Sequence, residues 1–208
     1  MTVQPEMPAT VASFLTDPAV RTAVEALLAV KADTLPPGLE WVDLDTYYRA
    51  RGGAELTRHD MAHFLRQLWQ CIWGSQTGPH WKPAPISELV DEEYAVTPEQ
   101  IWDEKSFTVY HYQKPYVLYT DIKLEPHALS IAFSIEDEEE GDVLMADDFP
   151  PFRWSGEDEE NWSGWQVLHE PCEPRGTLPN LDRLLKAAAA AYLTAEQAVI
   201  TRRGSSHT

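Results

Sequence analysis

Large apolar side chains occupy every second position of the segment Ala128-Leu129-Ser130-Ile131-Ala132-Phe133-Ser134-Ile135, which has the clearest alternation in the chain. A strand places alternate side chains on opposite faces of a sheet, so this pattern predicts a strand with one strongly apolar face. Residues 107–112 and 116–122 precede it and are rich in aromatic and β-branched residues, which favour strands. Lys114-Pro115 and Glu125-Pro126 supply the turns, and such short links predict an antiparallel meander.

The sheet is expected to continue after the quoted stretch. An acidic run at residues 136–142 leads to an expected fourth strand at residues 143–146, and residues 165–169 are a candidate fifth strand.

The chain before the sheet has helical rather than alternating periodicity. Asp17-Pro18 predicts a helix start, since Asp is a good cap and Pro suits the first helical position. Residues 44–50 are expected to form a short helix that stops at Gly52-Gly53. Thr57, with Asp60 three positions later, resembles a capping box that opens the next helix. The apolar stripe of that helix is Met61, Phe64, Leu65, Leu68 and Ile72.

Two more helices are expected. Thr97-Pro98 favours a short helix through Glu104, and Pro179-Asn180 opens a final helix whose alanine run permits close packing on a sheet. The sequence therefore predicts one α+β domain over residues 1–208. We expect a helical part at 1–104, an antiparallel sheet of four to five strands with acidic loops at 105–174, a closing helix at 175–200 and a frayed tail at 201–208.

The negative charge of the chain is concentrated in one segment. Residues 125–173 contain fifteen carboxylates and one basic side chain, Arg153, which gives a net charge of −14 out of −18 for the whole chain. Large aromatic side chains lie between and after the acidic clusters. Trp is typical of binding hot spots, and surrounding carboxylates attract a basic partner. The alternative is a pair of solvated loops that protect a sheet edge from aggregation.

The expected contact set for a partner lies inside this segment. It consists of Glu136, Asp137, Glu138, Glu139, Glu140, Asp142, Asp147, Asp148, Trp154, Glu157, Glu159 and Trp162.

These features favour a non-enzymatic binding protein that inhibits or neutralises a basic partner, such as a nuclease or another nucleic-acid-binding protein. An immunity protein, or a DNA mimic that blocks a defence nuclease, has this character, because repeated carboxylates imitate the phosphates of a duplex. Direct binding to nucleic acid or to anionic membranes is disfavoured, since a chain with a pI near 4.6 is negatively charged and repels phosphate groups.

Two other functions fit parts of the sequence. His59 and His63 are four residues apart, a spacing that metal-dependent hydrolases use, although Asp60 stands where zinc proteases have Glu. The expected pair of helices around Gly52-Gly53, with Arg58 and Arg66, also resembles a helix-turn-helix DNA-binding regulator.

No cofactor motif is evident, so we expect no cofactor. The sequence has no apolar run long enough for a transmembrane helix and no secretion signal, and its two cysteines do not make a disulfide framework. These features predict a cytoplasmic protein.

Overall fold

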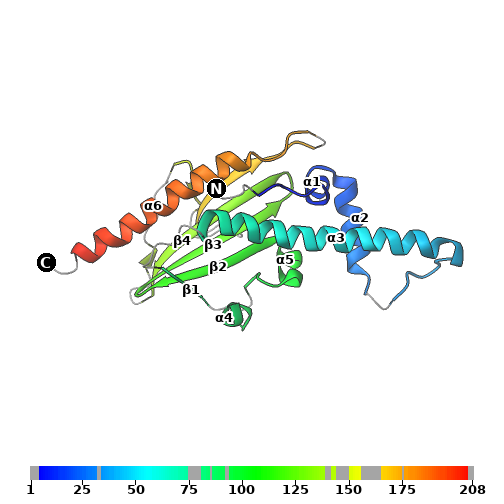
Figure 1. Ribbon diagram of the computed structural model, residues 1–208, viewed down its shortest axis with the longest axis horizontal. Helices are drawn as coiled ribbons and strands as arrows, with labels where there is room; N and C mark the ends of the chain where they lie inside the picture. The colour runs from blue at the N-terminus through cyan, green and yellow to red at the C-terminus, as the bar shows by residue number, and fades with distance from the viewer. Residues whose placement is uncertain are drawn as a thin grey trace.

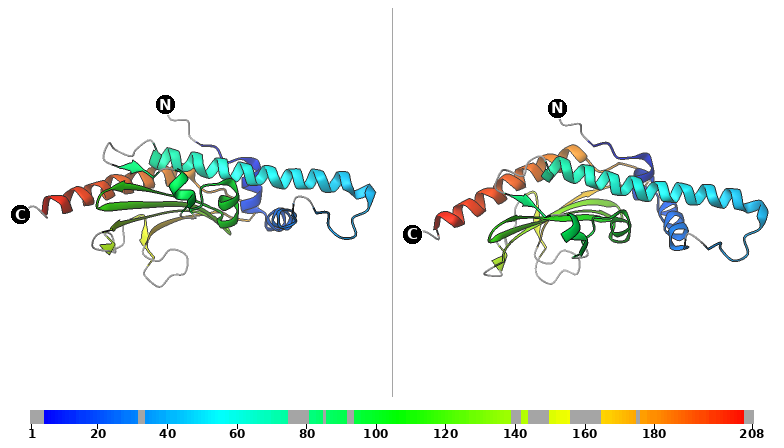
Figure 2. Two further views of the ribbon diagram at one scale, coloured as in Figure 1. Left: turned by 90° about the horizontal axis from the view of Figure 1, so that it is seen from below. Right: turned by 60° about the horizontal axis from the view of Figure 1, so that its bottom comes forward.

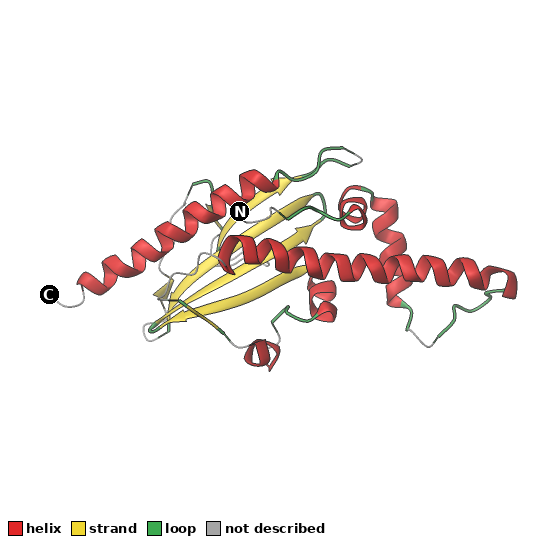
Figure 3. Ribbon diagram, in the orientation of Figure 1, coloured by secondary structure: helices red, strands yellow, loops and turns green. Residues whose placement is uncertain are grey.

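The computed structural model of the chain describes residues 5–31, 34–74, 81–84, 86–91, 94–138, 142–143, 150–155, 165–174 and 176–205. Helices pack on one face of an antiparallel sheet (Figures 1 and 3), so the predicted α+β class is confirmed. The helices are α1 (Ala9–Thr16), α2 (Pro18–Ala29), α3 (Leu44–Trp69), α4 (Ile86–Asp91), α5 (Pro98–Glu104) and α6 (Leu181–Ser205), with a 3-10 turn, η1 (Trp41–Asp43), and a π-helical turn, η2 (Gln70–Gly74).

The sheet has the strand order β1-β2-β3-β4-β7-β6, and β5 pairs with β4 beyond the end of β7. Its strands are β1 (Lys82–Pro83), β2 (Ser106–Gln113), β3 (Tyr116–Glu125), β4 (Ala128–Asp137), β5 (Asp142–Val143), β6 (Arg153–Trp154) and β7 (Gln166–Pro171). Every pair of neighbouring strands is antiparallel. The three predicted meander strands are confirmed and run longer than expected. Of the expected strand at 143–146, only residue 143 lies within the described chain.

The core lies between the sheet and the helices. Ile131 and Phe133 of β4 are fully buried, as are Phe64 and Leu68 of α3. The ring of Trp73 in η2 lies 6.0 Å from that of Phe133. One buried cluster extends from α1 to α6, so the helices and the sheet share a single core.

Helix α3 corrects the sequence-based expectation of two helices separated by a turn. It runs without a break through Gly52 and Gly53. Thr57 does not begin a helix as expected. Its hydroxyl donates to the Gly53 carbonyl (3.0 Å) within α3. Asp60 accepts a hydrogen bond from Thr10 of α1 (2.5 Å). Packing of α1 and α2 along the buried side of α3 outweighs the weak helix propensity of two glycines.

Other helix boundaries agree more closely with the sequence. Asp17 caps α2 by accepting from the Ala19 amide (2.9 Å), and Thr97 forms a capping box with Gln100 at α5. Asn180 accepts from the Arg183 amide (3.0 Å) at the start of α6. Helix α6 continues to Ser205, which corrects the expected end at residue 200. Among the described helices, none combines the length and the apolar composition that crossing a membrane requires.

The continuous α3 predicts the effect of Gly53→Ala. Gly53 lies inside a helix, and a Cβ atom added there meets nothing within 4 Å. We therefore expect Gly53→Ala to raise the free energy of unfolding by about 1 kcal/mol, measured by chemical denaturation. The exposed neighbour Ala50 supplies the matched control, since Ala50→Gly should lower it by a similar amount. A loss of stability in Gly53→Ala would mean that the chain turns at this glycine.

Candidate functional site: the outer face of the sheet

The sheet has one face turned toward the long helices and one turned away from them, which we call the outer face. Trp69 of α3 stacks on His111 at 5.5 Å and donates from its indole nitrogen to Thr120 (3.0 Å), so these two residues face the helices. Their neighbours along the strands therefore point the other way. Figure 2 shows α3 and α6 on the same side of the sheet, and β5 and β6 on the other side. By strand register, the outer face carries Tyr110, Tyr112, Tyr119, Asp121, Ser130, Ser134, Glu136 and His169.

A row of aromatic rings crosses the outer face. Tyr110 is 5.2 Å from Tyr94, 4.9 Å from Tyr112 and 5.9 Å from Tyr119, and Tyr119 is 6.2 Å from Trp165 (ring centroids). Tyr112, Tyr119 and Trp165 are half-buried, so each presents part of its ring to the surroundings. The row offers rigid contact area that needs little side-chain ordering on binding.

The described ends of two acidic segments are fixed on this side of the sheet. The Ser155 amide donates to the Trp165 carbonyl (2.9 Å), and the Trp165 amide donates to the Ser155 hydroxyl (3.1 Å). Ser155 and Trp165, the described residues that flank the acidic run at 157–160 in the sequence, are therefore bonded to each other beside the aromatic row. At the far end of β4, the Glu138 amide donates to the Pro115 carbonyl (3.1 Å).

Two residues of the expected contact set are well placed for a partner: Glu138 is exposed, and Glu136 is half-buried on the outer face. Trp154 is half-buried too, but it lies opposite Gln166 and so on the helix-facing side of the sheet. Burial, and next the nearby Glu138 charge, raise the pKa of Glu136 above its ordinary value. Two close carboxylates repel each other, and the approach of a cationic group lowers the free energy of that repulsion.

Another residue of that set needs correction. Asp137 is only 6% exposed and lies opposite Tyr116 on the helix-facing side, so it does not offer a carboxylate to a partner. The backbone of Asp142 belongs to β5. The remaining members lie outside the described residues: Glu139, Glu140, Asp147, Asp148, Glu157, Glu159 and Trp162.

Sequence reasoning missed a polar cluster on the outer face. The Ser130 hydroxyl donates to Glu125 Oε2 (2.5 Å) and lies 2.7 Å from His169 Nδ1, which is itself 3.0 Å from the same Glu125 oxygen. Register between β4 and β7 brings Ser130 opposite His169. No spacing in the sequence signals this contact, because the two residues are 39 positions apart.

The cluster contains serine, histidine and glutamate, yet its geometry differs from a catalytic relay. A relay uses both ring nitrogens of histidine, one toward the nucleophile and one toward the acid. Here Ser130 and Glu125 both contact Nδ1 of His169. The arrangement therefore ties β3, β4 and β7 together and does not activate Ser130 as a nucleophile.

Asp121 is a buried acid beneath the outer face. Burial raises its pKa to about 7, although hydrogen bonds from the Thr108 side chain and the Ile122 backbone, and the charge of Lys123, lower it. Its Oδ1 atom has no hydrogen-bond partner among the described residues. The sequence signal that could have marked this group is an acid inside a predicted strand.

His111 is the corresponding buried group on the helix-facing side. Burial lowers its pKa to about 4, so the ring is neutral at physiological pH. Stacking on Trp69 suits a neutral imidazole, and Nδ1 has no partner within the described chain.

The described residues provide no third ligand for the hypothesised metal site at His59 and His63. His59 and His63 are both exposed on α3, and Asp60, which would act as the base, is hydrogen-bonded to Thr10. Within the described ranges, no group of three or more His, Cys, Asp or Glu side chains is arranged to hold a metal ion.

The structure contradicts the pair of helices on which the helix-turn-helix hypothesis depends, because α3 has no turn at Gly52-Gly53. Its arginines also have partners within the chain. Arg58 pairs with Glu55 (2.7 Å), and Arg66 donates to the Val96 carbonyl (2.5 Å).

Comparison with known proteins does not assign the chain to a family. No protein-family model matches it, and searches of curated proteins and of solved structures found no match either.

The buried Asp121 predicts a pH-dependent contribution to stability. The unfolded chain releases this proton near pH 3.8, whereas the folded protein keeps it until about pH 7. The folded state thus binds more protons in this window, and Asp121 lowers stability as the pH rises through it. Asp121→Asn removes the titration. We expect the free energy of unfolding of the variant, relative to wild type, to increase from pH 4 to 7 by up to the order of 4 kcal/mol. A difference that is constant with pH would contradict this.

His111 predicts the opposite slope. Its pKa falls from 6.5 in the unfolded chain to about 4 in the folded protein, so the unfolded state binds more protons between these values. Its contribution to stability is therefore lost as the pH falls below 6.5. His111→Phe keeps a ring against Trp69 and removes the titration. In urea denaturation, the free energy of unfolding of the variant, relative to wild type, should increase by up to the order of 3 kcal/mol as the pH falls from 6.5 to 4. Parallel pH profiles of the two proteins would rule this out.

Proposed function

We propose that this protein is a non-enzymatic, acidic binding protein that inhibits or neutralises a basic partner, such as a nuclease or another nucleic-acid-binding protein. The observation that carries the proposal is the net charge of −14 within residues 125–173, a segment in which Trp165 is bonded to Ser155 and belongs to the aromatic row of the outer face.

The charge distribution supports a basic partner over an acidic one. Residues 1–124 have a net charge of −7 and residues 174–208 a net charge of +3, so the field is strongest around the sheet. A concentrated field of one sign accelerates association with an oppositely charged surface and disfavours anionic ligands. The carboxylates of this segment stand in for the phosphates that a nuclease groove binds.

The aromatic row gives the second part of the mechanism. Charge attraction between exposed groups is weak once solvent screens it, so a stable complex also needs contact area. Tyr112, Tyr119 and Trp165 supply it next to the acidic segments. In this proposal, the carboxylates steer the partner and the rings hold it, which occludes its basic groove. Neither the His59/His63 pair nor the Ser130 cluster has a geometry that favours an enzyme over this function.

Charge reversal in the acidic segment tests the proposal. The partner is first captured from native host lysate on the tagged protein, washed at low and then moderate salt, and identified by mass spectrometry. We expect a basic protein whose retention weakens with salt. Glu138→Lys, Glu139→Lys and Glu140→Lys in one chain should then weaken binding to the purified partner by at least about tenfold.

The matched control places the same charge change elsewhere. Glu6, Asp103 and Glu104 are exposed and lie outside the acidic segment, so their reversal to Lys changes net charge equally. We expect this control to retain most of the affinity. The proposal fails if the Glu138, Glu139 and Glu140 variant binds the partner as tightly as wild type, or if both triple variants lose affinity equally.

A further inference from the structure

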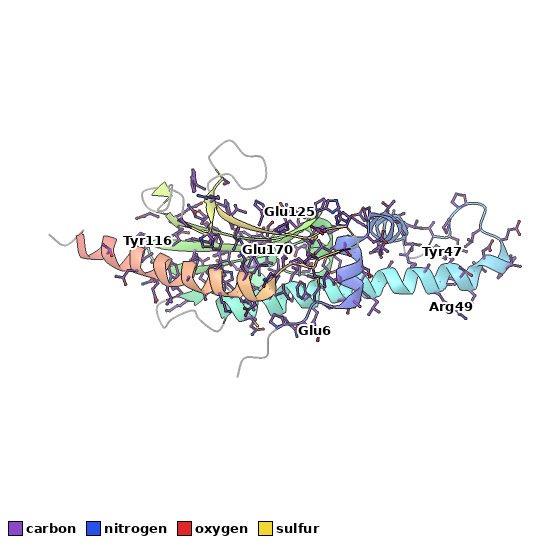
Figure 4. The ribbon with its side chains drawn as sticks, turned by 90° about the horizontal axis from the view of Figure 1, so that it is seen from above. Glu6, Tyr47, Arg49, Tyr116, Glu125 and Glu170 are labelled. Carbon is purple, nitrogen blue, oxygen red and sulfur yellow. The ribbon has the colours of Figure 1, made fainter. Side chains whose placement is uncertain are left out.

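The first half of α3 is a projecting arm with exposed large hydrophobic side chains on it and in the segment before it. Figure 1 shows α3 extending beyond the sheet, and Figure 4 places Tyr47 and Arg49 on this extension. Seven large hydrophobic side chains are exposed in the described chain, and five lie on or beside the arm. These five are Leu35 (48%), Trp41 (89%), Val42 (81%), Tyr48 (58%) and Leu56 (53%).

The exposed side chains of the arm form one straight stripe. Tyr48, Gly52, Leu56 and His59 are spaced by three or four residues, so they lie within about 40° of one another's mean direction on the helix. The stripe lies opposite the buried side of α3, where Thr57 and Met61 face α1 and the core. It is therefore a helix face that no described part of this chain covers.

Gly52 lies at the centre of this stripe. A glycine inside an exposed helix costs about 1 kcal/mol relative to alanine. A Cβ atom at Gly52 meets nothing within 4 Å, so no contact within the described chain requires its absence. Close approach of a second helix would make use of a position without a side chain.

The arm is also nearly neutral. Residues 41–63 contain four acidic and three basic residues, a net charge of −1 out of −18. Most of the negative charge that would oppose self-association lies outside the arm, in residues 125–173. Two arms can therefore meet with little charge repulsion.

We propose that two copies of this chain dimerise by antiparallel pairing of their α3 arms, with the twofold axis at Gly52. In this register Gly52 meets Gly52 of the second copy, and Tyr48 packs against Leu56. Asp45 comes opposite His59, and Arg49 comes beside Glu55. Each contact occurs twice, as an isologous interface requires, and Arg49 and Glu55 are an opposite-charge pair.

This pairing keeps the acidic bodies apart. Leu68, where α3 packs into the core, lies sixteen residues beyond Gly52. The two copies of Leu68 are then about 48 Å apart at 1.5 Å per residue. Repulsion between charges separated by more than the Debye length of about 8 Å is largely screened at physiological salt. The dimer does not depend on the proposed function, because the acidic segment takes no part in it.

Sedimentation equilibrium of the full chain tests this proposal. At about 100 µM a dimer with micromolar Kd is almost fully formed, and we expect twice the monomer mass. Leu56→Glu and Gly52→Gln should each raise Kd at least about tenfold. Gly52→Gln should meanwhile raise the stability of the monomer, since glutamine is the better helix former. Leu193→Glu makes the same change as Leu56→Glu at a 61% exposed site on α6 and should leave Kd unchanged.

Exchange of charges between positions 45 and 59 tests the register of the two paired helices. Asp45 and His59 are both exposed, so substitutions there leave the core intact. Asp45→Lys and His59→Asp should each weaken the dimer, and the double variant should recover affinity. A monomer at about 100 µM would overturn the proposal. A dimer that Leu56→Glu and Gly52→Gln leave unchanged would also overturn it, and a double variant without recovery would overturn the register.

Discussion

The packing of the second half of α3 on one face of the sheet is the constraint on which the rest of the structure depends. Phe64, Leu65 and Leu68 are fully buried there, and Trp69 both stacks on His111 and bonds to Thr120. Because this contact uses only half of a 26-residue helix, the other half extends as an arm. Because α3 and α6 share one face, the outer face is left without either. Both surfaces to which we assign binding roles follow from this single arrangement.

The two surfaces differ in the physical force on which they rely. In the function that we propose, the acidic segment attracts its partner through a long-range field that salt screens, and the rings of the outer face act only on contact. The arm is close to neutral and relies on apolar contact and close helix approach. The two surfaces consist of different residues, so charge repulsion at the acidic segment does not prevent the pairing that we propose for the arm.

The sequence predicts those features that depend on neighbours along the chain. The alternation at residues 128–135 and the cap at Asp17 gave the correct elements, because period and capping are local properties. Gly52-Gly53 misled the prediction for α3, since burial of Thr57 and Met61 on the same helix outweighs two exposed glycines. The cluster of Ser130 and His169 depends on register between β4 and β7, which no local pattern specifies.

In the function that we propose, the nucleic-acid-binding groove of the partner binds either nucleic acid or this protein's acidic segment, but not both. Fluorescence anisotropy of a labelled DNA duplex bound to the captured partner measures this directly. Addition of this protein should release the duplex, and higher salt should weaken the complex of the two proteins. An anisotropy that stays constant or rises, indicating that both ligands bind together, would contradict the account.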